Sequence, residues 1–183
     1  MQVFRPYVDH RKSARFLDDK RLGKQRVEAK QVLLAILRRR SVLRDGRRGW
    51  LNHPIVLMYD EGPYIEDLVE YFYAVVEEWT RRGYRNNMSL NDVEPLLKEV
   101  EEAPGTPVTG ELAREYRRLL LLKEPCYYYN KLSAEELEEL LKTPPRPYPG
   151  VNLWVFDVWE AYIRFMERLS RGVVDCAGIF PRR

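Results

Sequence analysis

Apolar residues recur at helical spacing along much of the chain, and no segment of useful length alternates as a half-buried strand does. Between residues 19 and 40, Leu22, Ala29, Leu33 and Ile36 fall on one face of a helix. The chain contains no internal repeat. These patterns predict an all-α protein that folds as a single compact multi-helix domain.

Capping and chain-breaking residues set the expected ends of the other helices. The clearest helix opens at Gly62-Pro63, closes at Gly83 and has an apolar face that includes Leu68 and Phe72. Asn52 is expected to cap a helix near Pro54. Further helices are predicted over residues 92–102 and 110–122, after the capping box Ser133–Glu136, and after a cap at Asn152.

A proline-rich segment is expected to separate the last helix from the rest of the chain. Residues 143–150 read Thr-Pro-Pro-Arg-Pro-Tyr-Pro-Gly, which cannot form a helix and is typical of a linker. We therefore expect a helical domain over residues 1–142, a Pro-rich linker over 143–150, and a C-terminal helix and tail over 151–183 that pack on the same domain.

Several classes of protein are excluded by what the chain lacks. It has no run of 18 apolar residues, no apolar signal-peptide core, no P-loop and no Gly-rich dinucleotide turn. Cys126 and Cys176 can pair, but two cysteines without a secretion signal favour a reduced, cytoplasmic protein. The two histidines, His10 and His53, are not spaced as metal ligands. We expect no cofactor, no metal and no membrane.

Positive charge is concentrated at the start of the chain. Residues 1–48 hold 15 Lys and Arg against five Asp and Glu, whereas residues 49–183 hold 16 against 23. Five of the cations lie between Arg15 and Arg26. This asymmetry indicates a polyanion on one face, most simply nucleic acid, although a solvated basic surface gives the same pattern.

Four polar residues share a stripe of the basic helix. Arg21, Lys24, Gln25 and Glu28 are spaced by three, four and seven positions, beside the apolar face. One interpretation is a DNA groove with a single carboxylate and a single amide directed at a sugar or base. The other is that Glu28 only forms an ion pair with its basic neighbours.

Several short blocks, in order and spacing, resemble the pyrimidine-dimer DNA glycosylase family, which includes phage endonuclease V. The blocks are Leu17–Val27, Gly49-Trp-Leu-Asn-His-Pro54, Met58-Tyr-Asp60, Trp79-Thr-Arg-Arg-Gly-Tyr84, and Arg117-Arg118 with the aromatic run Lys123–Tyr129. The likeness covers roughly residues 1–130, and the helix after Asn152 has no counterpart.

The resemblance implies a small helical repair enzyme, expected to be monomeric, that acts on double-stranded DNA containing damaged bases. An N-terminal α-amine, with a reference pKa of about 7.7–8.0, attacks the sugar C1′ and forms a Schiff base, and a glutamate assists. The catalytic candidates are Met1 and Glu28. The DNA-binding candidates are Arg5, Arg15, Lys20, Arg21, Lys24, Gln25, Arg26, His53, Arg118, Lys123, Tyr127 and Tyr128.

The chain departs from the family pattern at two positions. The phage enzyme exposes a Thr amine after Met removal, but Gln2 is a residue that normally blocks this removal, so either the amine is that of Met1 or there is no amine catalysis. Gly23 stands where the family glutamate is expected, which makes Glu28 the nearest candidate. Asp18 and Asp19 are its rivals, although Asp19 equally suits a helix cap.

Three alternatives remain open at this stage. The chain can be a non-catalytic DNA-binding module, or a glycosylase for another damaged base that lacks lyase activity. If the α-amine is not the nucleophile, Lys24 is the first lysine to consider. His53 equally suits a helix start bonded to backbone, and of the three tyrosines 127–129 at least one should be buried.

Overall fold

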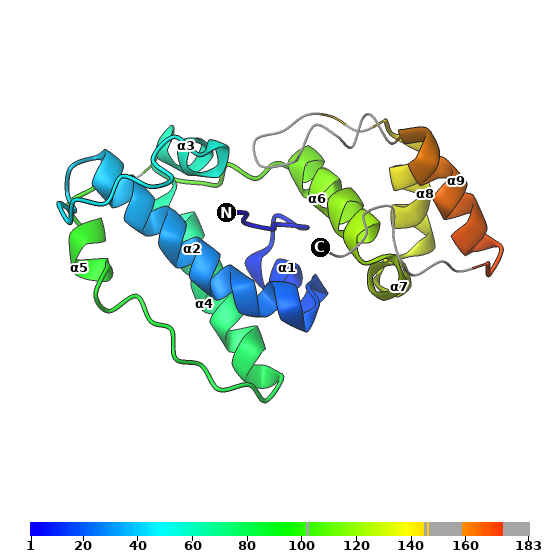
Figure 1. Ribbon diagram of the computed structural model, residues 1–183, viewed down its shortest axis with the longest axis horizontal. Helices are drawn as coiled ribbons and strands as arrows, with labels where there is room; N and C mark the ends of the chain where they lie inside the picture. Colours follow the sequence, from blue (N-terminus) through cyan, green and yellow to red (C-terminus); the bar gives the residue numbers. More distant parts are fainter. Residues whose placement is uncertain (102, 145, 147–158, 174–183) are drawn as a thin grey trace. The chain divides into compact units, whose positions relative to one another are not determined.

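Every regular element in the described part of the chain is a helix, which confirms the all-α prediction (Figure 1). The computed structural model describes all residues except 102, 145, 147–158 and 174–183. Its elements are α1 (His10–Phe16), α2 (Asp19–Arg39), α3 (Pro54–Asp60), α4 (Ile65–Arg81), α5 (Glu94–Leu97), α6 (Gly110–Lys123), α7 (Pro125–Tyr128), the 3-10 turn η1 (Tyr129–Lys131), α8 (Ala134–Lys142) and α9 (Trp159–Ser170).

The chain divides into two units, residues 1–109 and residues 110–183. Since residues 147–158 are not described, the expected linker over 143–150 and the boundaries based on it stay a prediction. The expected cap at Asn152 also lies outside the described residues. None of the helices described is both long enough and apolar enough to cross a membrane.

The core of the first unit forms where α2 packs on α4, with α1 also on α4 and α3 on α2 (Figure 1). The predicted apolar stripe of α2 is fully buried, as are Leu68, Phe72 and Val75 of α4. Each such side chain contributes about 1.5–3 kcal/mol when it leaves water. The periodicity of the sequence therefore identified the two central helices correctly.

Two caps lie one residue from their expected places. Asp18, rather than Asp19, caps α2, and its side chain accepts a hydrogen bond from the Arg21 backbone N–H at 2.9 Å. His53, rather than Asn52, caps α3, because its Nδ1 accepts from the Ile55 N–H at 3.2 Å. A ring nitrogen can accept a hydrogen bond from a free N–H at a helix start, as a side-chain oxygen does. The prediction of Asn52 as the cap was therefore wrong by one residue.

Two other expectations about helices were incomplete. The helix expected over residues 92–102 is a single turn, Glu94–Leu97. The seven-residue α1 has no predicted counterpart, because His10–Phe16 carries mainly polar and charged residues and shows no apolar stripe. Its N-terminus is nevertheless capped by Asp9, whose side chain accepts from the Lys12 N–H at 2.5 Å.

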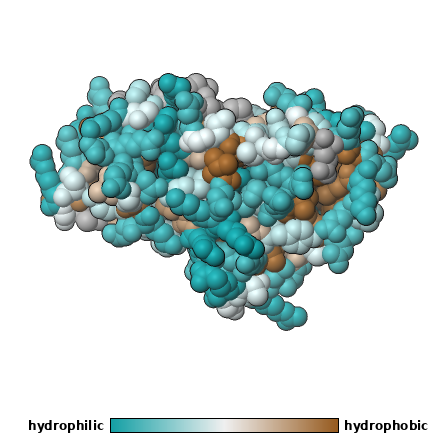
Figure 2. Space-filling view, turned by 180° about the vertical axis from the view of Figure 1, so that it is seen from behind, coloured by the Kyte–Doolittle hydropathy of each residue, from teal (hydrophilic) through white to brown (hydrophobic). Residues whose placement is uncertain are grey.

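The second unit consists of α6 to α9. The capping box at Ser133 is present, with the Ser133 hydroxyl and the Glu136 carboxylate each accepting from the other residue's backbone. Cys126, at the start of this region, is disulfide-bonded, which corrects the expectation of reduced thiols. On the face shown in Figure 2, hydrophilic side chains cover most of the surface and hydrophobic ones emerge in separate patches.

Candidate active site

The first residues of the chain are fixed against α2 by the amide of Gln25. Its Oε1 accepts from the Phe4 N–H at 2.7 Å, and its Nε2 donates to the Gln2 carbonyl at 3.0 Å. The Tyr71 hydroxyl donates to the Phe4 carbonyl at 2.6 Å. Gln25 is fully buried, so it positions the N-terminal segment and does not offer its amide to DNA as the sequence predicted.

Arg5 also anchors the N-terminal segment. Its guanidinium has no exposed surface and lies 2.7 Å from the Asp67 carboxylate, while Nη2 donates to the Val8 carbonyl at 2.7 Å. His10 Nε2 lies 2.8 Å from the second oxygen of Asp67. Arg5 is therefore a structural residue, in place of the phosphate contact that the sequence predicted.

Glu28 lies beside the N-terminus. Its Oε2 accepts from the Gln2 backbone N–H at 3.2 Å, one residue from the Met1 amine. Its Oε1 is 3.5 Å from Nζ of Lys24, whose side chain is 69% exposed. Glu28 itself is 8% exposed. The N-terminal segment thus lies along the polar stripe of α2 that contains Gln25 and Glu28, with Phe4 buried and Tyr7 half-buried.

His53 belongs to the same cluster. Burial lowers the pKa of His53, the positive N-terminal amine lowers it further, and the negative charge of Glu28 acts to raise it. Because both charges act on the imidazole, His53, the amine and Glu28 share one local field. Since Nδ1 accepts from the Ile55 N–H, the neutral ring carries its proton on Nε2.

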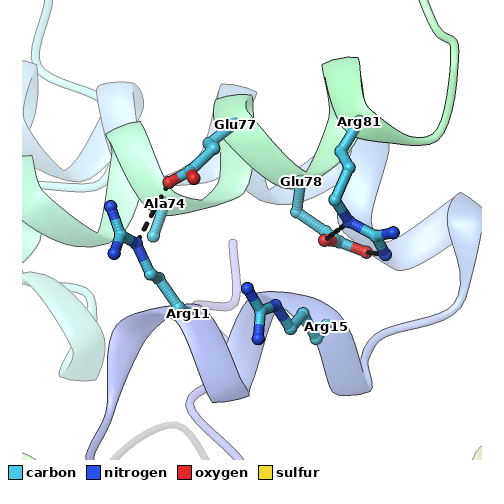
Figure 3. Close-up of a pocket in the computed structure, with 6 residues that line it drawn as sticks. All are labelled: Arg11, Arg15, Ala74, Glu77, Glu78 and Arg81. Atoms are coloured by element: carbon cyan, nitrogen blue, oxygen red, sulfur yellow. Dashed lines mark hydrogen bonds and ion pairs between the residues drawn. The ribbon is translucent and has the colours of Figure 1, made fainter.

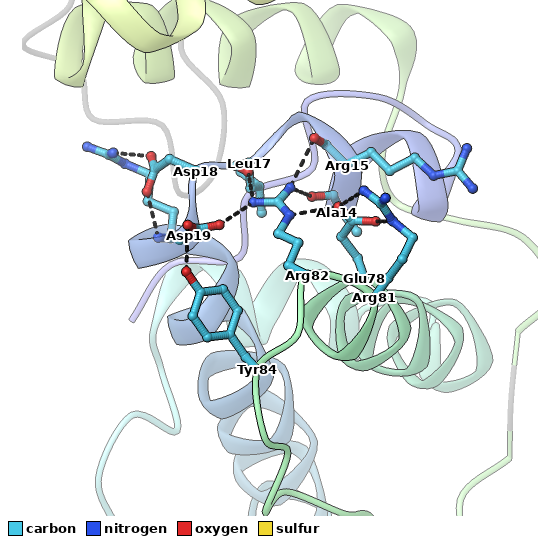
Figure 4. A network of polar contacts seen from close by, with 10 residues as sticks. Ala14, Arg15, Leu17, Asp18, Asp19, Glu78, Arg81, Arg82 and Tyr84 are labelled. Carbon is cyan, nitrogen blue, oxygen red and sulfur yellow. Dashed lines mark hydrogen bonds and ion pairs between the residues drawn. The ribbon is translucent and has the colours of Figure 1, made fainter.

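The basic corner between α1 and α2 is held by Arg82 at the end of α4 (Figure 4). Its guanidinium donates to the carbonyls of Leu17 and Arg15 at 2.8 and 3.2 Å, and to Asp19 at 2.8 Å. These carbonyls lie at the C-terminal end of α1, where the helix has no further turn to supply backbone donors. Glu78 accepts from Arg82 at 2.7 Å and fixes the orientation of the guanidinium.

The cations of this corner have different environments. Arg15, Lys20 and Lys24 are exposed, and Arg21 is half-buried in an ion pair with Asp18. The guanidinium carbon of Arg26, by contrast, lies 4.2 Å from the centre of the Trp79 ring, and Nη1 donates to Asn86 at 2.8 Å. Arg26 is only 9% exposed, so it joins α2 to the end of α4 rather than meeting a phosphate.

A small pocket between α1 and α4 is lined by residues that include Arg15 and Glu78 of this corner, and Glu28 and His53 are not among them (Figure 3). Its lining carboxylates are already engaged by arginines: Glu77 by Arg11 at 3.1 Å, and Glu78 by Arg81 at 2.7 Å. Of these two ion pairs, Arg11–Glu77 joins α1 to α4, whereas Glu78 and Arg81 both lie on α4. Among the described residues, no group of three or more His, Cys, Asp or Glu is arranged to hold a metal ion.

The remaining predicted contacts belong to the second unit. Arg118 is fully buried and donates to the carbonyls of Leu140 and Thr143, both at 2.6 Å, so it binds α8 in place of DNA. Tyr128, another DNA-binding candidate, is also fully buried, so its ring packs in the core and does not face DNA; at least one tyrosine of 127–129 was expected to be buried. Lys123 and Tyr127 are half-buried, and the Lys131 ammonium lies 4.9 Å from the centre of the Tyr127 ring.

Several residues that position the site were not singled out from the sequence. Asp67 and Tyr71 act on the N-terminal segment from α4, and Arg82 acts on α1. Their partners lie more than 60 residues away in the chain. The pattern Arg81-Arg-Gly-Tyr84 was the one signal for Arg82, and it carried no information about which carbonyls Arg82 meets.

The described geometry holds the Glu28 carboxylate one residue from the N-terminal amine and 3.5 Å from the exposed ammonium of Lys24, and both the amine and Glu28 act on the His53 imidazole. A carboxylate can move protons, an amine can act as a nucleophile, and the cations can meet phosphates. Searches of curated proteins and of solved structures find no match to the chain. The family model described as pyrimidine dimer DNA glycosylase matches residues 1–92, half of the chain. The chain therefore belongs to the pyrimidine dimer DNA glycosylase family.

Proposed function

We propose that this protein excises damaged pyrimidines, such as pyrimidine dimers, from duplex DNA, and that it then cleaves the strand as a lyase. The proposal rests on one observation above the others. The Gln2 N–H donates to the carboxylate of Glu28 at 3.2 Å, and the Met1 amine is the next backbone nitrogen along the chain. The match to the family over residues 1–92 supports the same chemistry.

The Met1 amine is the proposed nucleophile. Its lone pair attacks C1′ of the damaged nucleotide, and the glycosidic bond breaks with its electron pair passing to the departing base. Loss of a proton and opening of the sugar ring leave a Schiff base between the amine and C1′. Removal of a proton from C2′ then expels the 3′ phosphate by β-elimination, which cleaves the strand.

Glu28 is the proposed proton carrier. A carboxylate one residue from the amine can accept the proton that the amine releases as the C1′–N bond forms. It also stabilises positive charge that develops on the sugar. Its exposed fraction of 8% keeps water away from the carboxylate, which strengthens both effects.

The exposed cations at the α1–α2 corner are proposed to position the duplex. Lys20 and Lys24 are exposed on the first turns of α2, and Nζ of Lys24 lies 3.5 Å from Glu28. Contacts from such residues to phosphates fix register without reading sequence. His53, with its proton on Nε2, can donate a hydrogen bond to an oxygen of the sugar or base.

Borohydride reduction in the presence of ultraviolet-irradiated duplex DNA tests the proposal. A Schiff base is reduced to a stable amine, so the expected result is a covalent protein–DNA adduct that undamaged duplex does not give. Strand cleavage without an adduct contradicts the amine mechanism. Base release without strand cleavage indicates a glycosylase without lyase activity, and binding alone indicates a non-catalytic module.

A further inference from the structure

Trp50 is the most exposed aromatic side chain near the proposed site. Its exposed fraction is 56%, whereas the indole of Trp79 is largely covered. It sits in the loop between α2 and α3, three residues before His53. An exposed indole offers a large apolar ring face, with a polar N–H at its edge, that a binding partner can cover.

The backbone of Trp50 is in an unfavourable conformation. Its φ is +69°, in the left-handed region that bulky residues rarely adopt. Glycine would occupy this conformation without strain, and Gly49 is the preceding residue. Strain of this kind at an exposed tryptophan does not stabilise the fold, and strained residues cluster at sites that bind ligands.

Neighbouring contacts tie Trp50 to the proposed site. The Trp50 ring meets the His53 ring edge-on, with centres 5.4 Å apart. The Trp50 carbonyl accepts from the His53 N–H at 3.0 Å. The charges of the N-terminal amine and Glu28 both act on the His53 imidazole, so the indole contacts a residue of the proposed site.

The loop is also positively charged. Arg44, Arg47 and Arg48 are exposed, and the one carboxylate among them, Asp45, is held by Arg38 at 2.7 Å. The side chain of Arg47 is 78% exposed. An exposed indole flanked by arginines is the combination that binds unstacked nucleobases, with the ring against the base and the cations near the backbone.

We propose that Trp50 stacks on a nucleobase of the damaged pair when that base leaves the duplex, and so holds the lesion open for attack at C1′. This inference rests on the proposed function and extends it to a residue that recognises the substrate. The partner is the π-face of a base, and the arginines of the loop meet the adjacent phosphates. No covalent step is involved.

Affinity measurements with Trp50 variants test the inference. Trp50→Gly removes the ring and relieves the φ strain, so the variant should fold at least as well as the wild type, which thermal unfolding checks. Trp50→Leu keeps apolar bulk without a π-face, and Trp50→Phe keeps the π-face. All are made in a Glu28→Gln background to prevent cleavage.

Binding to three duplexes of otherwise identical sequence is compared at fixed salt. The first contains a single thymine dimer and the second is undamaged. The third is doubly abasic, because abasic analogues replace both nucleotides of one base pair. Trp50→Gly and Trp50→Leu should lose about 5- to 150-fold in affinity for the dimer duplex, and Trp50→Phe should retain most of it. Neither loss should extend to the undamaged or doubly abasic duplex, which offer no extruded base.

The outcomes separate this inference from the proposed function. If the Glu28→Gln parent prefers the dimer duplex and Trp50→Gly prefers it equally, stacking is wrong and the proposed function stands. If Trp50→Gly weakens all three duplexes alike, Trp50 acts on the backbone and the inference is also wrong. If neither the parent nor the wild type distinguishes the dimer duplex, both proposals fail.

Discussion

Gly23 lies directly against the indole of Trp79. A Cβ atom at position 23 would stand 2.9 Å from both Cη2 and Cζ3 of the tryptophan ring. The indole is held from its other sides, because Nε1 donates to the Arg85 carbonyl at 3.1 Å and Tyr84 stacks on it at 4.1 Å. This contact explains why glycine interrupts the first turns of α2 and where α4 docks.

Gly23→Ala should therefore lower stability, although alanine is the better helix former by about 1 kcal/mol. The overpacking against Trp79 costs about 1–3 kcal/mol and exceeds the gain in helix propensity. The free energy of unfolding, measured by urea titration, should fall by about 1 kcal/mol.

Gly110→Ala is the matched control, because no atom lies within 4 Å of a Cβ built at Gly110, the first residue of α6. It should be neutral or slightly stabilising. If Gly23→Ala were as stable as this control, the indole would not constrain α2.

Glu28→Gln should reduce strand cleavage by about 10²–10⁴-fold while DNA affinity stays the same or rises. The amide keeps an oxygen that can accept from the Gln2 N–H, but it cannot take a proton, and one negative charge leaves the basic surface. Single-turnover cleavage and binding to ultraviolet-irradiated duplex measure the two effects separately.

The control for this prediction is Glu66→Gln, the same change at an exposed residue in the first turn of α4. It should leave cleavage within about twofold of the wild type. Full activity in Glu28→Gln would move the carboxylate role elsewhere, and loss of folding would show that Glu28 serves only as a structural ion-pair partner.

Local chemistry explains which parts of the fold were predictable. The capping box at Ser133 and the apolar stripe of α2 depend on residues that are close together in the sequence, and both were predicted. The roles of Arg5 and Gln25 were missed because the sequence of a basic segment does not show whether a given cation or amide is exposed or buried. Their partners, Asp67 and the backbone of residues 2–4, become neighbours only when the chain folds.

Duplex DNA affinity should fall steeply with salt, with a slope of log K against log[salt] of about −0.9 per phosphate contact. Lys20→Glu, at an exposed position on the first turn of α2, should flatten this slope by at least about 0.9. Lys98→Glu makes the same charge change among acidic residues and should leave the slope unchanged. A wild-type slope near zero would refute the DNA interface.

Stability should decline in acid because of Asp67. Burial acts to raise the pKa of Asp67, but hydrogen bonds from His10 and Arg5 and the charge of Arg5 outweigh it, so the pKa lies below its ordinary value. The unfolded chain then binds the proton more readily than the folded one. The stabilisation is complete above the ordinary carboxyl pKa and is lost as pH falls through the lower, folded value.

Asp67→Asn should remove this part of the acid dependence and lower stability at neutral pH by about 3–5 kcal/mol, because Arg5 is left buried without its counter-ion. Tyr59 does not compensate, because burial raises its pKa to about 12 and it stays neutral. Urea titrations between pH 3 and pH 7 compare the two proteins. If the free energy of unfolding depended on pH identically in the two proteins, Asp67 would contribute nothing to the loss of stability in acid.

An extension of the N-terminus should abolish strand cleavage and borohydride trapping while DNA affinity stays within a few-fold of the wild type. The added residue converts the Met1 amine into an amide, which has no nucleophilic lone pair. The Gln25 hydrogen bonds to residues 2 and 4 still fix the segment, so the fold and the exposed cations are preserved. The same tag at the C-terminus is the control and should leave trapping intact. An N-terminally extended protein that still forms the adduct would assign the reaction to a lysine, and Lys24, 3.5 Å from Glu28, is the first to replace with arginine.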